Sequence, residues 1–191
     1  MADNKPAGQD MSDMSEVQLT SQTVFEGRLL HVKSDRVRLL NGHETTREYI
    51  LHPGASMIIA MPDEKTITLI RQYRYPLNRH FIEVPAGKID PGEDPLDTAK
   101  RELREECGYS AAEWRHLTTL HPAIGYANER IELYLARGIT QAGRQLDDDE
   151  FLEVMHVPVT EAMTWIRDGR ITEAKAVMAL LWAEKILRGE W

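Results

Sequence analysis

The sequence predicts an α+β domain in which a mixed β-sheet carries helices on its faces. Two observations favour this class. Short apolar runs with strand-like spacing recur along the chain, and a few segments with helical spacing interrupt and follow them. Strands interleaved with a few helices are typical of an α+β architecture. With 191 residues, of which 42% are hydrophobic and 28% charged, the chain is long enough to bury a core.

The strand predictions begin with a hairpin. Asn41-Gly42 separates the segments 37–40 and 45–51, and Asn-Gly readily supplies the positive φ angles of a two-residue type I′ turn. The triplet His52-Pro53-Gly54 then predicts a module boundary. Apolar or alternating segments predict further strands at 56–61, 66–73, 80–84, 131–136 and 151–159.

The helix predictions depend on apolar spacing and on end signals. The segment 94–107 starts with the capping residue Asp94, and Gly108 suits the left-handed conformation that ends many helices. Two C-terminal helices are also expected, each after a threonine that can cap it: 161–167 after Thr160 and 173–187 after Thr172.

Composition divides the chain into three parts. Residues 1–16 are polar and acidic, and we expect a disordered tail there. Residues 17–53 form a small antiparallel β module, and residues 54–191 form the main domain. The tail has neither a basic segment nor an apolar one, so we expect no secretory signal.

Charge, apolar run length and cysteine content exclude several classes of partner. The net charge of −8 repels a nucleic-acid backbone, so no nucleic-acid partner is expected. The longest mostly apolar runs are shorter than the roughly 20 residues that cross a bilayer, so no membrane partner is expected either. A single cysteine permits no internal disulfide, which fits a reducing cytoplasm as the expected location.

Three carboxylates gather on the helix predicted at 94–107. Glu102 and Glu106 lie one turn apart and Glu105 lies beside them, a spacing that destabilises a helix. The alternative is a solvated face on which Asp97, Arg101 and Glu105 form i,i+4 pairs. We favour a metal site, because hard divalent cations prefer oxygen ligands and a Gly/Pro-rich loop precedes this cluster.

The loop and the helix carry a specific motif. The segment 87–109, GKIDPGEDPLDTAKRELREECGY, matches the Nudix box G-x5-E-x7-R-E-U-x-E-E-x-G-U at every fixed position, where U is a bulky apolar residue. The chain therefore resembles the Nudix hydrolase superfamily. Only Tyr109 departs, since an aliphatic residue is usual there. The resemblance implies an α/β/α sandwich, with 54–191 as the catalytic domain.

The resemblance also implies roles for individual residues. Glu102, Glu105 and Glu106 are expected to bind Mg²⁺, with Mn²⁺ as an alternative, and the Ala86 carbonyl is expected to add a ligand. Glu105 is also expected to take part in catalysis. The structural residues of the motif are expected to be Gly87, Glu93, Arg101 and Gly108, with Glu93 and Arg101 bracing the loop against the helix.

Over most of 24–187 the chain is similar to the ADP-ribose pyrophosphatase branch of this superfamily. The similarity rests on four segments: 71–75, 83–87, 125–129 and 147–150. It implies Mg²⁺-dependent hydrolysis of ADP-ribose to AMP and ribose 5-phosphate. One departure is His-Pro-Ala-Ile-Gly at 121–125, where the branch commonly has Ser-Pro-Gly.

The same branch implies how the substrate is held. Arg71 and Arg74 are expected to share one face of their strand and to hold the diphosphate, since guanidinium groups bind phosphates bidentately. Glu83 and Glu129 are also expected to contact the substrate. A general base is expected in the acidic run that ends at Glu150, with Glu153 as the alternative.

Three further expectations concern alternatives and assembly. The substrate could instead be another nucleotide sugar, such as ADP-glucose or GDP-mannose. A non-catalytic nucleotide sensor is the alternative from another class, although the intact glutamate set disfavours it. The resemblance implies a homodimer through the 17–53 module, since a lone hairpin is marginal in water and its apolar face needs cover.

Overall fold

The computed structural model describes residues 14–146 and 151–191. The chain divides into an N-terminal unit, Met1–His52 with Gly125–Asn128, and a main unit, Pro53–Ile124 with Glu129–Trp191. Most of the predicted tail, residues 1–13, lies outside the described residues. None of the described helices is long and apolar enough to cross a membrane.

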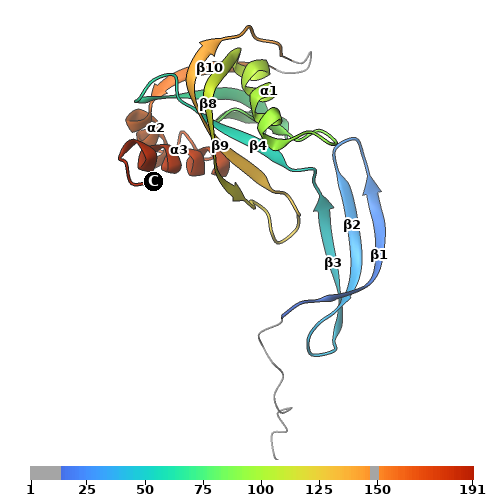
Figure 1. Cartoon of the computed structure of the whole chain (residues 1–191). Coiled ribbons are helices and arrows are strands. Elements are labelled where there is room, and N and C mark those ends of the chain that lie inside the picture. The colour runs from blue at the N-terminus through green and yellow to red at the C-terminus, as the bar shows by residue number, and fades with distance from the viewer. Residues whose placement is uncertain (1–13, 147–150) are drawn as a thin grey trace, which may run out of the picture. The chain divides into compact units, whose positions relative to one another are not determined.

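The N-terminal unit is an antiparallel sheet in the order β1-β2-β3, with strands β1 (Val17–Glu26), β2 (His31–Arg38) and β3 (Glu44–Leu51) (Figure 1). The end of β3 also bonds to the distant segment of this unit. The Ile50 amide donates to the Tyr126 carbonyl at 2.8 Å, and the Asn128 amide donates to the Ile50 carbonyl at 3.2 Å. These bonds explain why residues 125–128 belong to this unit.

The predicted two-residue turn at Asn41-Gly42 is wrong, because the connection spans residues 39–43. Only Gly42 of this loop has a positive φ, +81°. The Asn41 side chain accepts a hydrogen bond from the His43 amide at 3.0 Å, and the Leu39 amide donates to the His43 carbonyl at 2.9 Å. Asn41 therefore supports the turn through its side chain rather than through a left-handed backbone.

The main unit contains two sheets within the described residues. One has the order β7-β4-β9-β8, and its central pair, β4 (Ala55–Ala60) and β9 (Ile131–Gln141), is parallel. The other has the antiparallel order β10-β5-β6. The remaining strands are β5 (Thr66–Arg74), β6 (Arg79–Glu83), β7 (Ala86–Lys88), β8 (Tyr109–Leu120) and β10 (Leu152–Pro158).

Helices cover both faces of the sheet layer in the main unit, as Figure 1 shows for α1 on one side and α2 and α3 on the other. These helices are α1 (Pro95–Cys107), α2 (Val159–Arg167) and α3 (Ala174–Leu187). Every residue of β4 is buried, and alternate side chains enter different cores. Met57 and Ile59 pack with residues of α2 and α3, whereas Ile58 and Ala60 pack with α1. The α+β class and the α/β/α layering are therefore confirmed.

The ends of α1 match the sequence signals. The Asp94 side chain accepts a hydrogen bond from the Leu96 amide at 2.9 Å, and Gly108 ends the helix with φ +75°. A Cβ at Gly108 would lie 3.1 Å from the Arg144 amide nitrogen, so the helix end packs against this backbone.

The predicted threonine caps of the last two helices are wrong. Helix α2 begins directly after Pro158, which provides no side-chain cap. Helix α3 is capped by Glu173, whose carboxylate accepts a hydrogen bond from the Ala176 amide at 2.8 Å. Glu173 therefore fills the role that was expected of Thr172.

The α1 core yields a first prediction. Leu103 is fully buried against the sheet, so Leu103→Ala should lower the free energy of unfolding by about 3 kcal/mol, through lost transfer energy and the cavity left behind. Urea denaturation checks this. The control Leu181→Ala removes an equal side chain that is 40% exposed on α3 and should cost less than about 1 kcal/mol. Equal losses in both variants would contradict this assignment of the core.

Candidate active site

Arg101 joins the loop that precedes α1 to the helix itself. Its guanidinium donates to both Glu93 carboxylate oxygens, at 2.9 and 3.0 Å, and to the Lys88 carbonyl at 3.1 Å. The expected Glu93–Arg101 pair is therefore present in the structure. Glu93 in turn accepts a hydrogen bond from the Thr98 hydroxyl at 2.7 Å and one from the Asp90 amide at 3.2 Å.

The same guanidinium reaches two of the three clustered carboxylates. Arg101 donates to Glu102 at 2.7 Å and to Glu105 at 2.9 Å. The alternative of paired surface charges is thus partly realised, since Arg101 and Glu105 do pair, whereas Asp97 pairs with Lys100 at 3.0 Å. Glu102 is only 9% exposed, so its face of α1 is not a solvated one.

Two carboxylates of the cluster, Glu106 and Glu102, lie against the short strand β7. Glu106 is buried and accepts a hydrogen bond from the Ala86 amide at 3.0 Å. A Cβ added to Gly87 would overlap the carboxylate of Glu102. Glycine at this position therefore opens the space in which the Glu102 carboxylate lies against the backbone.

This donor set fits a hard divalent cation. Mg²⁺ prefers oxygen ligands. The carboxylates on successive turns of α1 and the backbone carbonyls of the adjacent strand β7 can supply them. In residues 14–146 and 151–191, no three His, Cys, Asp or Glu side chains form a ready metal shell. Arg101 instead holds Glu102 and Glu105 together.

Hydrogen bonds and charge lower the pKa of the Glu93 carboxyl. Its bonds to Arg101 are the main cause, and the Thr98 and Asp90 donors add to them, so the pKa of Glu93 falls from 4.5 to about 2. The Glu93 carboxylate in turn raises the pKa of the Arg101 guanidinium, and Glu102 and Glu105 add to this effect. The brace between loop and helix is therefore ionic over the whole physiological range.

The two candidate diphosphate-binding arginines lie on opposite faces of β5, so the expectation of a shared face is wrong. They are three residues apart in a strand of regular register, and side chains in a strand alternate. Arg74 pairs with Glu83 through two hydrogen bonds of 2.7 Å. Arg71 pairs with Glu153 of the neighbouring strand at 3.4 Å.

The alternation of side chains along β10 also determines where the candidate general base Glu153 points. Val154 packs with the α1 core, so its neighbour Glu153 points to the other face of the sheet, away from the glutamates of α1. Glu150 lies outside the described residues. Glu129 is half-buried and lies two residues before the start of β9 in the main unit.

Sequence reasoning missed two residues that support this site. Thr98 is fully buried and holds Glu93, yet a threonine within a helix has no distinctive sequence signal. Glu173, the cap of α3, lies near enough to Arg74 to raise the pKa of its guanidinium, after the larger effect of Glu83. Glutamate is not among the preferred N-cap residues, so the sequence favoured the neighbouring Thr172.

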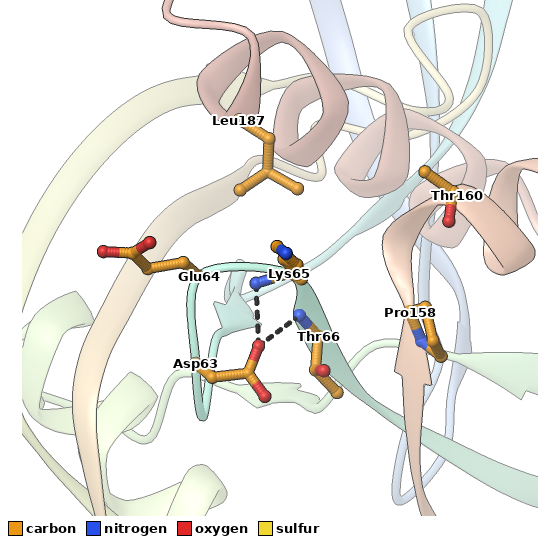
Figure 2. Close-up of a pocket in the computed structure, with 7 residues that line it drawn as sticks. All are labelled: Asp63, Glu64, Lys65, Thr66, Pro158, Thr160 and Leu187. Carbon is orange, nitrogen blue, oxygen red and sulfur yellow. Dashed lines mark hydrogen bonds between the residues drawn. The ribbon is translucent and has the colours of Figure 1, made fainter.

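A hollow of about 580 Å³ lies elsewhere in the main unit, between the β4–β5 turn and the neighbouring ends of α2 and α3 (Figure 2). Asp63 closes the turn by accepting hydrogen bonds from the Lys65 and Thr66 amides at 2.7 and 2.8 Å. No motif residue lines this hollow; its lining is Asp63, Glu64, Lys65, Thr66, Pro158, Thr160 and Leu187. We therefore assign the candidate site to α1 and β7.

Comparison with known families decides the identity of the fold. The NUDIX domain matches residues 50–180, which include the loop, α1 and the contacts of Arg101 described above. The chain belongs to the Nudix family. The nucleoside diphosphate sugar hydrolase N-terminal domain matches residues 16–50, which form most of the N-terminal unit. This Nudix protein is therefore a hydrolase with an additional N-terminal β module.

Several relatives of this Nudix protein are known. The methanol dehydrogenase activator of Bacillus methanolicus is 38% identical, over 85% of this chain and 89% of its own. The ADP-ribose pyrophosphatase of Bacillus subtilis is 36% identical, over 89% of this chain and 93% of its own. A crystal structure of an ADP compounds hydrolase superposes with a TM-score of 0.83 at 29% identity, over 92% of this chain and 95% of that one.

The low pKa of Glu93 predicts acid sensitivity. Because the folded value of about 2 lies below the unfolded 4.5, the ionised pair stabilises the fold fully above pH 4.5, and this contribution is lost as the pH falls towards 2. Glu93→Gln should therefore lower stability at neutral pH and flatten its decline with acid. Urea midpoints at several pH values test this, with Glu113→Gln on exposed β8 as control. An unchanged slope in Glu93→Gln would refute the coupling.

The close approach at Gly87 predicts a metal defect with little change in fold. Gly87→Ala must displace the Glu102 carboxylate, which ends a flexible side chain and moves more readily than backbone. The Mg²⁺ concentration for half-maximal activity should rise on the order of tenfold or more, while the circular dichroism spectrum stays the same. Gly125→Ala, whose Cβ meets nothing within 4 Å, is the control. Unaltered Mg²⁺ dependence in Gly87→Ala would exclude Glu102 as a ligand.

Proposed function

We propose that this protein hydrolyses the diphosphate bond of ADP-ribose to AMP and ribose 5-phosphate in a Mg²⁺-dependent reaction. The observation that carries the proposal is the cluster of Glu102, Glu105 and Glu106 on α1, packed against β7 beside Arg74. Support for the substrate comes from the relatives named ADP-ribose pyrophosphatase in Bacillus subtilis and Mycobacterium tuberculosis.

Glu102, Glu105 and Glu106 would hold the cation together with the Ala86 carbonyl. A divalent cation bound there neutralises diphosphate charge and acidifies the water that attacks phosphorus. Gly87 leaves the space that the Glu102 carboxylate needs, and hydrogen bonds from Arg101 orient Glu102 and Glu105. Mn²⁺ has the same preference for oxygen ligands and is the alternative metal.

Arg74 supplies the positive charge for the diphosphate on the face of β5 that α1 covers. Glu150 is proposed as the general base that takes the proton of the attacking water. Glu153 is the weaker candidate, because it faces away from α1 and bonds to Arg71. Arg71 and Glu129 remain proposed substrate contacts.

We also propose a homodimer and a cytoplasmic location. Large apolar side chains stand exposed on the N-terminal unit, among them Phe25 at 53% and Leu29 at 52%. Exposed apolar patches of this kind mark interaction sites, and two-fold pairing is the commonest arrangement of soluble oligomers. The single cysteine, Cys107, is buried, which fits a reducing compartment.

The experiment that tests the function measures phosphate released from a panel of nucleotide sugars, with alkaline phosphatase present and Mg²⁺ varied. The panel contains ADP-ribose, ADP-glucose and GDP-mannose. The expected result is a kcat/KM for ADP-ribose at least tenfold above the others, with no release in EDTA. Preference for another sugar would replace the substrate, and no hydrolysis of any panel member would refute catalysis.

Removal of one ligand charge gives a sharper test of the metal site. Glu106→Gln preserves size and should keep the fold, yet lower kcat on the order of 100-fold or more. Steady-state kinetics at saturating Mg²⁺ and a melting curve measure both effects. Glu113→Gln makes the same change on exposed β8 and should behave like the wild type. Near wild-type turnover by Glu106→Gln would show that Glu106 is no metal ligand.

The proposed dimer predicts that charge on the exposed apolar surface dissociates the protein. Phe25→Glu with Leu29→Glu should convert a dimer into a monomer in light scattering at micromolar concentration. The control Leu77→Glu changes a residue that is 64% exposed in the main unit and should stay dimeric. A monomeric wild-type protein would sink the proposal outright.

A further inference from the structure

Glu83 is an unusual carboxylate for a substrate-binding residue, because it is almost wholly buried. Its residue is 2% exposed, whereas the side chain of its partner Arg74 is 46% exposed. A buried ionised carboxylate is costly unless hydrogen bonds and an opposite charge compensate it. Arg74 provides both, so the pair has an inner anion and an outer cation.

The geometry of this pair uses one edge of the guanidinium. The Arg74 Nε donates to Glu83 Oε1, and Nη2 donates to Oε2, each at 2.7 Å. Both oxygens of Glu83 are thus directed at Arg74. Of the five N–H groups of Arg74, three do not take part in this pair, including both on Nη1. They form an outer edge whose fork matches two oxygens of a phosphate.

The surroundings of Arg74 place this residue next to the proposed site. Glu106 of α1 lies close enough to raise the pKa of Arg74, after the larger effect of Glu83. The register of β5 and β6 pairs Ile70 with Glu83, so Glu83 lies on the same face as Ile70, which packs with α1. Arg74 is therefore a fixed cation beside a proposed metal ligand.

We propose that Glu83 is a positioning residue that acts on the substrate only through Arg74, by holding the guanidinium so that its outer edge meets the diphosphate. This inference rests on the proposed function and refines it, since Glu83 itself makes no substrate contact. It also explains why lysine would not serve at position 74. An ammonium group is a point donor and does not present a planar second edge.

A double-mutant cycle tests the inference. The variants are Glu83→Gln, Arg74→Lys and the combination, each assayed for kcat and KM with ADP-ribose and for melting temperature. Loss of the fixed orientation should lower kcat/KM on the order of 100-fold in each single variant. If Glu83 acts only through Arg74, the combination loses little more than either single variant. Independent contacts would multiply to about 10⁴-fold.

Two further variants separate positioning from a general structural effect. Glu83→Asp keeps the buried charge and should recover at least tenfold over Glu83→Gln in kcat/KM. It also replaces Glu83→Gln in the cycle if the amide variant does not fold. Asp168→Asn removes the acid of another bidentate arginine pair, with Arg170 at 2.6 and 3.0 Å, and should leave kcat/KM unchanged.

Calorimetric titration with ADP and Mg²⁺ makes the test independent of turnover. The same cycle in dissociation constants should show coupling between Glu83 and Arg74. Such coupling without ADP-ribose hydrolysis would refute the proposed function and leave the inference standing. Multiplicative losses, wild-type kinetics in Glu83→Gln, or no binding of ADP by the wild type would each overturn the inference.

Discussion

The bonds of the Arg101 guanidinium are the interaction on which the candidate active site depends. One cation contacts three carboxylates, from Glu93, Glu102 and Glu105, and the main-chain carbonyl of Lys88. Carboxylates this close repel one another, and partial burial strengthens the repulsion. Arg101 therefore does two things at once: it offsets the like charge of the clustered glutamates, and it fixes the loop on the helix. The fixed spacing of arginine and glutamates in the Nudix box places these groups where they can make these contacts.

The alternation of side chains along β5 determines which charged groups lie on the same face of the sheet. Arg74 and Glu83 share a face with α1, whereas Arg71 and Glu153 lie on the opposite face. The Arg74–Glu83 pair and the main packing of α2 and α3 thus lie on opposite sides of one sheet layer. The presence of two arginines in one strand does not show this separation, because neighbouring side chains of a strand point to opposite faces.

The sequence predicted the features whose signal lies in neighbouring residues, and it missed those that depend on residues far apart in the chain. Helix α1 was predictable because Asp94 and Gly108 mark its ends locally. Strand β8 was missed because none of its residues is fully buried and its sequence has no regular apolar alternation. The motif identified Glu102 and Glu106, but the partner of Glu83 depends on the register between β5 and β6, which no local pattern encodes.

Gly108 combines two requirements that are independent of each other. Its φ of +75° disfavours any side chain, and its missing Cβ lets the Arg144 amide nitrogen approach. The Ala142 amide also donates to the Gly108 carbonyl at 2.8 Å. Since the nearest neighbour is backbone, no replacement at position 144 compensates for a larger residue at 108. The end of α1 is thus tied through backbone contacts to the segment that follows β9, and a conservative Gly108→Ala exchange would disturb both together.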